Sequence, residues 1–305
     1  MKAFRNLVMM TAVLSLTACS NDENEVLDGP VAAKVTANID GVQTRAAGTT
    51  WDANDQIGIS VTSTTGKTTG TNVLYTISNT TSGSFESTKP IYFQDMNEVT
   101  FSAYYPYAET GGTITKTIAA ADQEADAQKK IDYMFASGAK AGKSSPEVKF
   151  ISDGTTDARF KHRMSQVILT FKQGEDTDLK NMTNFTVSGL KMTGTFNTAD
   201  GTATATSDAA SDLTITETPT ASDSYTRSLI LFPQTVSNNK FSLSLTLGGE
   251  TYSTDLNIPN SGTALVSGNK YTYTITVNKT KLTVSQATIA DWGNGGEQNG
   301  NAEMQ

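Results

Sequence analysis

The heptapeptide Tyr271-Thr272-Tyr273-Thr274-Ile275-Thr276-Val277 alternates large apolar side chains with threonine. A period of two places the two sets on opposite faces of a strand, so the segment predicts a strand with one buried and one hydrated face. The same alternation precedes Gly248-Gly249, a hairpin signal, in a segment formed by Phe241, Leu243, Leu245 and Leu247. Strands of this kind are typical of antiparallel sheets packed as a sandwich.

The composition also favours an all-β chain. Of the 305 residues, 37% are hydrophobic, and threonine, serine, glycine and asparagine are abundant. The most helix-like segment, 119–130, is polar nearly all round and predicts a surface excursion of about one or two turns. Turn-forming residues gather at 152–157, so we expect two antiparallel β-sandwich domains in tandem, over 31–155 and 156–292.

Short alternating segments recur through the first predicted domain. Val31 to Ile39 has an apolar residue at every second position and ends at the turn signal Asp40-Gly41. Further strands are expected in this half, including one over 114–118. Tyr104, Tyr105 and Tyr107 form an aromatic cluster, which could be a platform that stacks on sugar rings or a contribution to the core. Both interpretations stay open.

The start of the chain predicts export. Lys2 and Arg5 precede an apolar run of about ten residues, which matches a secretory signal and falls short of the roughly twenty needed to span a bilayer. The run ends in Leu16-Thr17-Ala18-Cys19, which resembles a bacterial lipobox and predicts a lipid on Cys19 and a signal peptide over 1–19. An ordinary signal peptide that ends near a cysteine is the alternative.

The acidic segment 20–30 has little to bury and predicts a flexible tether. It also resembles the surface-export signal of lipoproteins in the Bacteroidetes, although a solvated linker would look the same. Because Cys19 is the only cysteine, disulfides within the chain and multi-thiolate metal sites are excluded.

Several function classes lack support in the sequence. The net charge of −8 and the absence of clustered Lys and Arg argue against nucleic acid as a partner. His162 is the only histidine, has no acid nearby in the sequence and favours a structural or surface role. Thr65-Gly66-Lys67-Thr68 resembles the end of a phosphate-binding loop, but Val61 stands where the first glycine is required. We therefore expect no enzyme, cofactor or metal, with a glycosidase pair of scattered carboxylates left open because sequence cannot test it.

The end of the chain carries an irregular strand pattern. Leu282 and Val284 share one register, whereas Ala287 and Ile289 share the other, so the alternation slips near Gln286. Such a slip predicts a β-bulge or two short strands in succession. The segment 293–305 is rich in glycine and asparagine and predicts a flexible tail.

Several motifs together resemble the fimbrillin (Mfa-like) family, the type V pilus subunits of Bacteroidales. They are Thr44-Arg45-Ala46 with Trp51 to Ile59, Phe101 to Tyr107, Ile131-Asp132-Tyr133-Met134, Phe160 to Ser165, and Ile289 to Trp292. The resemblance implies two transthyretin-like, Greek-key sandwich domains and a structural subunit of a fimbria on the cell outer membrane that supports adhesion. It agrees with the strands expected from the alternation.

The resemblance also implies a mode of assembly. An arginine-specific protease would cut between Arg45 and Ala46 and release the early strand within 31–45, together with the lipid. The terminal segment of an identical or related subunit would then add to the open sheet as a donor strand, with Leu282, Val284, Ala287, Ile289 and Trp292 as its contact residues. The alternatives are a pilus anchor or tip subunit, or a surface lipoprotein that binds glycan or host protein without polymerising.

Overall fold

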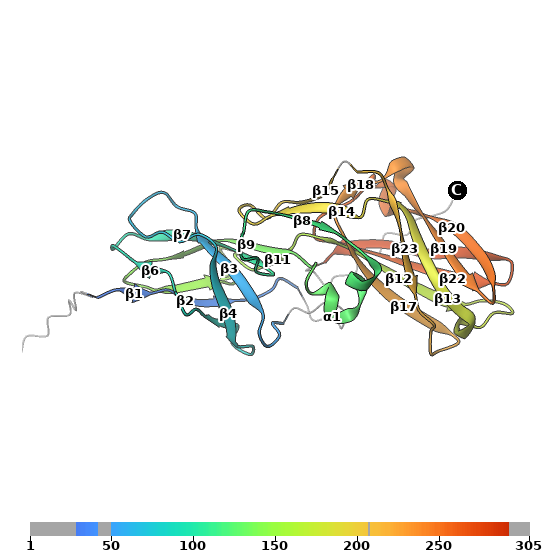
Figure 1. The fold of residues 1–305 in the computed structure, drawn as a ribbon, viewed down its shortest axis with the longest axis horizontal. Helices are drawn as coiled ribbons and strands as arrows, with labels where there is room; N and C mark the ends of the chain where they lie inside the picture. Colours follow the sequence, from blue (N-terminus) through green and yellow to red (C-terminus); the bar gives the residue numbers. More distant parts are fainter. Residues whose placement is uncertain (1–28, 42–49, 207, 293–305) are drawn as a thin grey trace, which may run out of the picture.

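The computed structural model describes residues 29–41, 50–206 and 208–292, and these form an elongated molecule built almost entirely of strands (Figure 1). The prediction of an all-β fold is confirmed. The helical segments are η1 (Ala120–Gln123), α1 (Ala125–Gln128), η2 (Leu179–Asn181), η3 (Ser237–Asn239) and η4 (Pro259–Ser261). Within the described ranges, no helix is long and apolar enough to cross a membrane.

The first half of the molecule contains an eight-stranded sheet with the order β10-β2-β5-β4-β3-β7-β9-β11. Its strands are β2 (Lys34–Ala37), β3 (Gln56–Val61), β4 (Val73–Asn79), β5 (Ser84–Glu86), β7 (Val99–Tyr105), β9 (Met134–Ala141), β10 (Glu147–Phe150) and β11 (Lys161–His162). All neighbours in this sheet are antiparallel except β2 and β10, which run parallel. At the outer end of this half, β1 (Val31–Ala32) pairs with β6 (Tyr92–Phe93).

The second half contains two four-stranded sheets with the orders β17-β12-β22-β23 and β16-β13-β19-β20. Their strands are β12 (Ser165–Gln173), β13 (Met182–Leu190), β16 (Ser211–Thr216), β17 (Ser224–Leu231), β19 (Lys240–Leu247), β20 (Glu250–Asn257), β22 (Asn269–Asn278) and β23 (Lys281–Asp291). Two short strands, β18 (Gln234–Thr235) and β21 (Ala264–Leu265), pair with each other.

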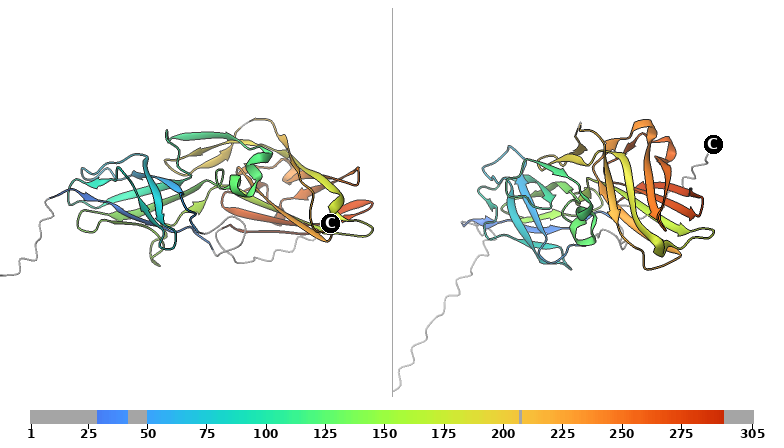
Figure 2. Two further views of the ribbon diagram at one scale, coloured as in Figure 1. Left: turned by 60° about the horizontal axis from the view of Figure 1, so that its bottom comes forward. Right: turned by 45° about the vertical axis from the view of Figure 1, so that its right-hand side comes forward.

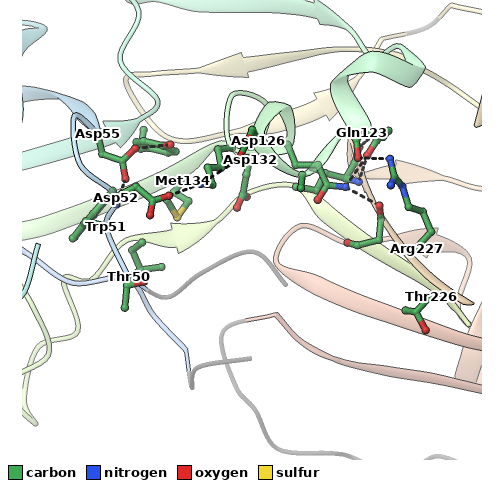
Figure 3. Close-up of a pocket in the computed structure, with 17 residues that line it drawn as sticks. Thr50, Trp51, Asp52, Asp55, Gln123, Asp126, Asp132, Met134, Thr226 and Arg227 are labelled. Atoms are coloured by element: carbon green, nitrogen blue, oxygen red, sulfur yellow. Dashed lines mark hydrogen bonds and ion pairs between the residues drawn. The ribbon is translucent and has the colours of Figure 1, made fainter. Parts of the chain in front are cut away.

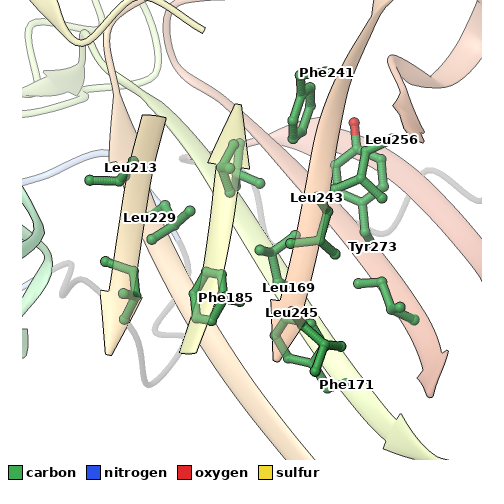
Figure 4. Close-up of a cluster of buried hydrophobic side chains, with 14 of the residues drawn as sticks. Leu169, Phe171, Phe185, Leu213, Leu229, Phe241, Leu243, Leu245, Leu256 and Tyr273 are labelled. Atoms are coloured by element: carbon green, nitrogen blue, oxygen red, sulfur yellow. The ribbon is translucent and has the colours of Figure 1, made fainter. Parts of the chain in front are cut away.

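Buried apolar side chains of the first half form a first core. A second core fills the space between the two sheets of the second half (Figure 4). Tyr273 of β22 and Leu169 of β12 meet side chains of the facing sheet, such as Leu243. The apolar residues of β22 are buried, as the sequence pattern predicts, whereas the threonines that alternate with them are half-buried, so the face expected to be hydrated is only partly exposed. Gly248 and Gly249 adopt positive φ angles at the predicted hairpin between β19 and β20, a conformation that glycine adopts without steric cost.

A three-stranded sheet joins the two halves. β8 (Thr113–Thr117) pairs with β14 (Thr193–Asn197), which pairs with β15 (Ala203–Ala205). The sequence pattern placed the strand over 114–118 within the first half, but its pairing partner belongs to the second half. A third apolar cluster beside this sheet contains side chains of both halves, including Tyr133 and Phe196, whose rings stack at 4.7 Å. The domain boundary near 155 stays a prediction.

The segment 119–130 forms two short helical turns, as expected, but it is more than a surface excursion. The buried Gln123 donates from Nε2 to the Ile230 carbonyl and accepts at Oε1 from the Ile230 N–H, each at 2.9 Å. This amide therefore fixes the segment to β17 of the second half. Figure 2 shows the segment at the junction between the halves.

Candidate assembly site

The early segment 31–39 lies inside the first sheet and not on its surface. β2 pairs parallel with β10 on one edge, where Val35 lies opposite Val148, and antiparallel with β5 on the other, where Val35 lies opposite Phe85. Main-chain bonds continue on both edges, from Lys34 N to the Pro146 carbonyl and from Ala37 N to the Gly83 carbonyl, each at 2.9 Å. We call the space between β10 and β5 that β2 fills the slot.

Four side chains of the early segment face the first core at strictly alternating positions. Their exposed fractions are 6%, 3%, 0% and 6% for Ala33, Val35, Ala37 and Ile39, which we call the inward set of the slot. The Trp51 ring packs edge-on against Phe85 and Phe160, each at 5.1 Å between centroids, and its Nε1 donates to the Ala37 carbonyl at 2.7 Å. Removal of the segment would expose apolar surface and leave two strand edges unpaired.

The segment points from the outer end of the molecule toward the junction between the halves. Val31 pairs with Phe93 at the outer end, whereas Ile39 forms a parallel bridge with Phe160 just before β11 and β12. The chain leaves the sheet at Asp40, whose carboxylate contacts Arg159 at 2.7 Å. The end of the slot where the early segment enters therefore lies at the outer end of the first half.

The predicted donor segment forms β23, the edge strand of its sheet. Within the described part of the chain it pairs only with β22. Thr274 lies opposite Gln286 and Ile275 opposite Val284, so Ser285 is the extra residue of a β-bulge. The slip expected near Gln286 is thus present.

The contact residues assigned to this segment have different degrees of burial. Leu282 and Trp292 are buried, whereas Val284, Ala287 and Ile289 are half-buried against the second core. These last three side chains thus gain burial if they move into a closed slot.

The junction between the halves brings together three motifs of the resemblance. The buried His162 ring has Nδ1 at 2.8 Å from Asp132 Oδ1, and the Trp292 ring stacks on it at 4.2 Å between centroids. The main-chain N–H of Trp292 donates to the Gly268 carbonyl at 2.6 Å. Burial favours the structural of the two roles expected for His162, but no local pattern pointed to its partner Asp132, which lies thirty positions away in the sequence.

The aromatic cluster lies largely inside the molecule. Tyr104 and Tyr105 are buried, and their hydroxyls donate to Asn72 Oδ1 at 2.6 Å and to Asp55 Oδ1 at 3.1 Å. Burial raises the pKa of the Tyr105 hydroxyl, and the neighbouring Asp55 carboxylate raises it further. Tyr107 is half-buried. The ring faces of the first two are covered by protein, so this arrangement favours the core interpretation, and the glycan platform stays a prediction.

A cavity of about 490 Å³ lies beside the junction (Figure 3). Its charged groups pair with neighbours: Lys129 contacts Asp52 at 2.5 Å, and Arg227 contacts Glu124 and Glu217, each at 3.0 Å. Among the described residues there is no group of three or more His, Cys, Asp or Glu that could hold a metal ion. The charged groups of the cavity are therefore paired within the protein, and apolar side chains such as Trp51 and Met134 also line it.

Three predicted processing residues, Cys19, Arg45 and Ala46, lie outside the described residues. The described chain resumes at Thr50, so the early segment and the rest of the first sheet flank the predicted cleavage position on its two sides.

Comparison with known proteins identifies a matching family and a related protein. The sequence profile of the fimbrillin-like family matches residues 44–292. The candidate fimbrium subunit Fim1C of Bacteroides uniformis is 32% identical over 328 aligned residues, which cover 99% of this chain and 100% of that protein.

Solved structures agree in fold. A candidate cell adhesion protein of Bacteroides ovatus is 31% identical with a TM-score of 0.72, over 87% of this chain and 98% of that chain. The C-terminally truncated tip fimbrial protein Mfa3 of Porphyromonas gingivalis, at 11% identity and a TM-score of 0.52 over 86% and 100%, shares the fold. These relatives carry names of fimbrial and adhesion proteins and not of enzymes, in agreement with the expectation of a non-catalytic chain. The profile match and the B. uniformis relative together show that this chain belongs to the fimbrillin-like family.

Proposed function

We propose that this protein is a structural subunit of a cell-surface fimbria that polymerises by strand exchange and supports adhesion. The observation that carries the proposal is the placement of β2, a short strand paired on both edges whose chain continues into the segment that contains Arg45. The fimbrial and adhesion names of its relatives support the same assignment.

The strand directions suit head-to-tail assembly. Two residues separate β11 of the first sheet from β12, and β22 runs parallel to β12. Asn278 therefore lies at the end of the second half away from the first. Figure 1 shows β22 and β23 along this half. If β23 left its sheet at the turn before Lys281, it would extend beyond that end of the molecule.

A released β23 would meet the slot of the next copy in the correct direction. It would enter at the outer end of that copy and run inward, as β2 does, and would therefore lie parallel to β10. The contact joins different surfaces of the two copies and need not close, so it generates a filament. The partners are thus identical or related subunits.

The expected strength of the contact follows from burial and pairing. Full burial of Leu282, Val284 and Ile289 contributes about 1.5 to 3 kcal/mol each, and each main-chain hydrogen bond contributes about 1 kcal/mol net. A strand held by both edges in this way exchanges slowly. Such a polymer would survive on an unboiled gel.

In this proposal, proteolytic maturation controls when the subunit can polymerise. The exported lipoprotein would be tethered to the outer membrane through Cys19, and an arginine-specific protease would cut between Arg45 and Ala46. The early segment would then be held by noncovalent contacts alone. Its departure, with the lipid, would open the slot.

The experiment that tests the proposal is to determine the N-terminus and apparent mass of the protein taken from its native cell surface. Mass spectrometry should find a start at Ala46, and an unboiled gel should show a ladder of high-mass species that collapses on boiling. A lipidated Cys19 on a monomer would contradict polymerisation. That result would instead favour a pilus anchor or a surface protein that binds glycan or host protein.

A further inference from the structure

Two segments from opposite ends of the chain present matching side chains to the two cores. The inward set of the slot has a strict spacing of two and consists of Ala33, Val35, Ala37 and Ile39. The apolar set of β23 has spacings of two, three and two and consists of Leu282, Val284, Ala287 and Ile289. Once the extra residue Ser285 is set aside, the last three members read valine, alanine and isoleucine in both segments.

The bulge is what makes this match. Without it, a period of two would place Gln286 and Thr288 on the same face as Val284. In the slot these side chains would occupy the positions of Ala37 and Ile39, which are buried. Burial of a carboxamide without a hydrogen-bond partner is unfavourable, so a regular β23 would fit the slot poorly.

We infer that β23 enters the slot of a second copy of this chain with its bulge retained, so that Val284, Ala287 and Ile289 take the positions of Val35, Ala37 and Ile39. Thr283, Ser285, Gln286 and Thr288 then face away from the core. Leu282 takes the position of the smaller Ala33. This inference rests on the proposed strand exchange and adds the register and the residues that specify it.

The position of Ala37 selects most strongly for size. This side chain is fully buried, and its carbonyl accepts the hydrogen bond from Trp51. Gly83 lies against the same main-chain carbonyl, because a Cβ placed on Gly83 would lie 2.3 Å from the Ala37 carbonyl oxygen, so the backbone at this position has no room to shift toward β5. Ala287, in contrast, is half-buried on an edge strand in its own sheet. A larger side chain at 287 is thus tolerated in the free subunit and rejected by the slot.

β23 can enter the slot in three registers: with the bulge retained, with strict alternation through Gln286, or with strict alternation through Ser285. Two substitutions distinguish these registers. The test uses the full chain, cut at Arg45 with an arginine-specific protease, and measures polymer yield on an unboiled gel. In the inferred register, both Val284→Ala and Ala287→Leu reduce the yield about tenfold or more, because one empties a buried position and the other overfills one. Ala290→Leu is the matched control, since Ala290 is another half-buried alanine of β23 that faces away from the slot, and it leaves the yield unchanged.

Other outcomes of the two substitutions would contradict the inferred register. A loss with Val284→Ala alone indicates strict alternation through Gln286, and a loss with Ala287→Leu alone indicates strict alternation through Ser285. Normal polymer from both variants also overturns it. If even the cut wild-type chain forms no polymer, the proposed function fails first, and the register fails with it.

A peptide assay keeps the test independent of folding. A synthetic peptide with the sequence of residues 280–292 is added to the cut wild-type chain. The wild-type and Ala290→Leu peptides should block polymer formation, whereas the Val284→Ala and Ala287→Leu peptides should require at least about tenfold higher concentration. Equal potency of all four peptides contradicts the inference.

Discussion

Strands β2 and β23 differ in how their own sheets hold them. β2 is paired on both edges and its inward side chains are buried. β23 has one partner in the described part of the chain, and three of the apolar side chains that pack on its own core are half-buried. A β23 strand that moves from a sheet edge into a slot therefore gains a second row of hydrogen bonds and further burial.

Covalent attachment of the early segment explains why the uncut chain would not exchange β2 for a strand of another molecule. While the early segment is covalently attached, its effective concentration at the slot far exceeds that of a strand from another molecule. Cleavage removes this advantage and lets the two strands compete on their contacts alone. The proteolytic step, and not the affinity of β23, is then the point of control.

The largest expected effect comes from loss of the cleavage site. Arg45→Ala should abolish maturation, because the proposed protease is specific for arginine, and high-mass species should disappear from an unboiled gel of the cell surface fraction. Arg45→Lys keeps the charge and should fail equally, whereas Thr44→Ala should mature normally. Normal polymers from Arg45→Ala would mean that the slot opens by another route.

The second prediction concerns burial in the slot. Val35→Asp places a carboxylate at a buried position of β2 and should lower the free energy of unfolding of the uncut chain by at least about 3 kcal/mol. Lys34→Asp, at the exposed neighbouring position, should change it by less than about 0.5 kcal/mol. Urea unfolding followed by tryptophan fluorescence measures both, and equal losses would show that β2 does not fill the slot in solution.

The third prediction addresses the other strand. Trp292→Ala removes the ring that stacks on His162 and should destabilise the fold by about 3 kcal/mol. Hydrogen exchange should show faster exchange of the amides in β23 with little change in β2, because the stack holds the end of β23 at the junction. Trp292→Phe keeps an aromatic ring there and should preserve most of the protection, and uniform loosening of both strands would contradict this localised role.

The side-chain periodicity predicted the faces of the strands well. The alternation in β22, the glycine hairpin after β19 and the slip in β23 are all present at the expected residues. Periodicity indicates which side chains of a strand face the core, but it does not indicate which other strand pairs with that strand. The pairing of β8 with β14 and the parallel pairing of β2 with β10 depend on contacts between distant segments, so neither followed from the sequence.

The candidate site was predictable to a similar degree. The early and terminal segments could be identified by their patterns, whereas the pairing of His162 with Asp132 could not, because a hydrogen bond across thirty residues leaves no local signal. The one available sign was that both residues lie in motifs of the resemblance. The aromatic cluster shows the same limit, since tyrosines suited to stack on sugars are equally suited to a core.

The smallest expected effect is electrostatic and concerns the end of the early segment. Hydrogen bonds from Arg159, together with Lys161, hold the pKa of the Asp157 carboxyl well below its usual range, and Arg159 also contacts Asp40. A lowered pKa stabilises the fold at pH values above the unfolded-state pKa of about 4, and this contribution disappears as the pH falls toward the folded-state pKa. Asp157→Asn should therefore cost under about 1 kcal/mol at neutral pH and nothing in strong acid.

A matched carboxylate in the second half makes this last test specific to one region. Lys240 lowers the pKa of Asp255, where the pair joins β19 to β20, so Asp255→Asn should show a pH dependence of the same sign. Only Asp157→Asn, however, disturbs the contact that fixes Arg159 beside Asp40, so it alone should speed release of the early segment after cleavage at Arg45. Equal release rates for the two variants would show that the charges around Arg159 do not hold this segment, and that its retention depends on burial of the inward set.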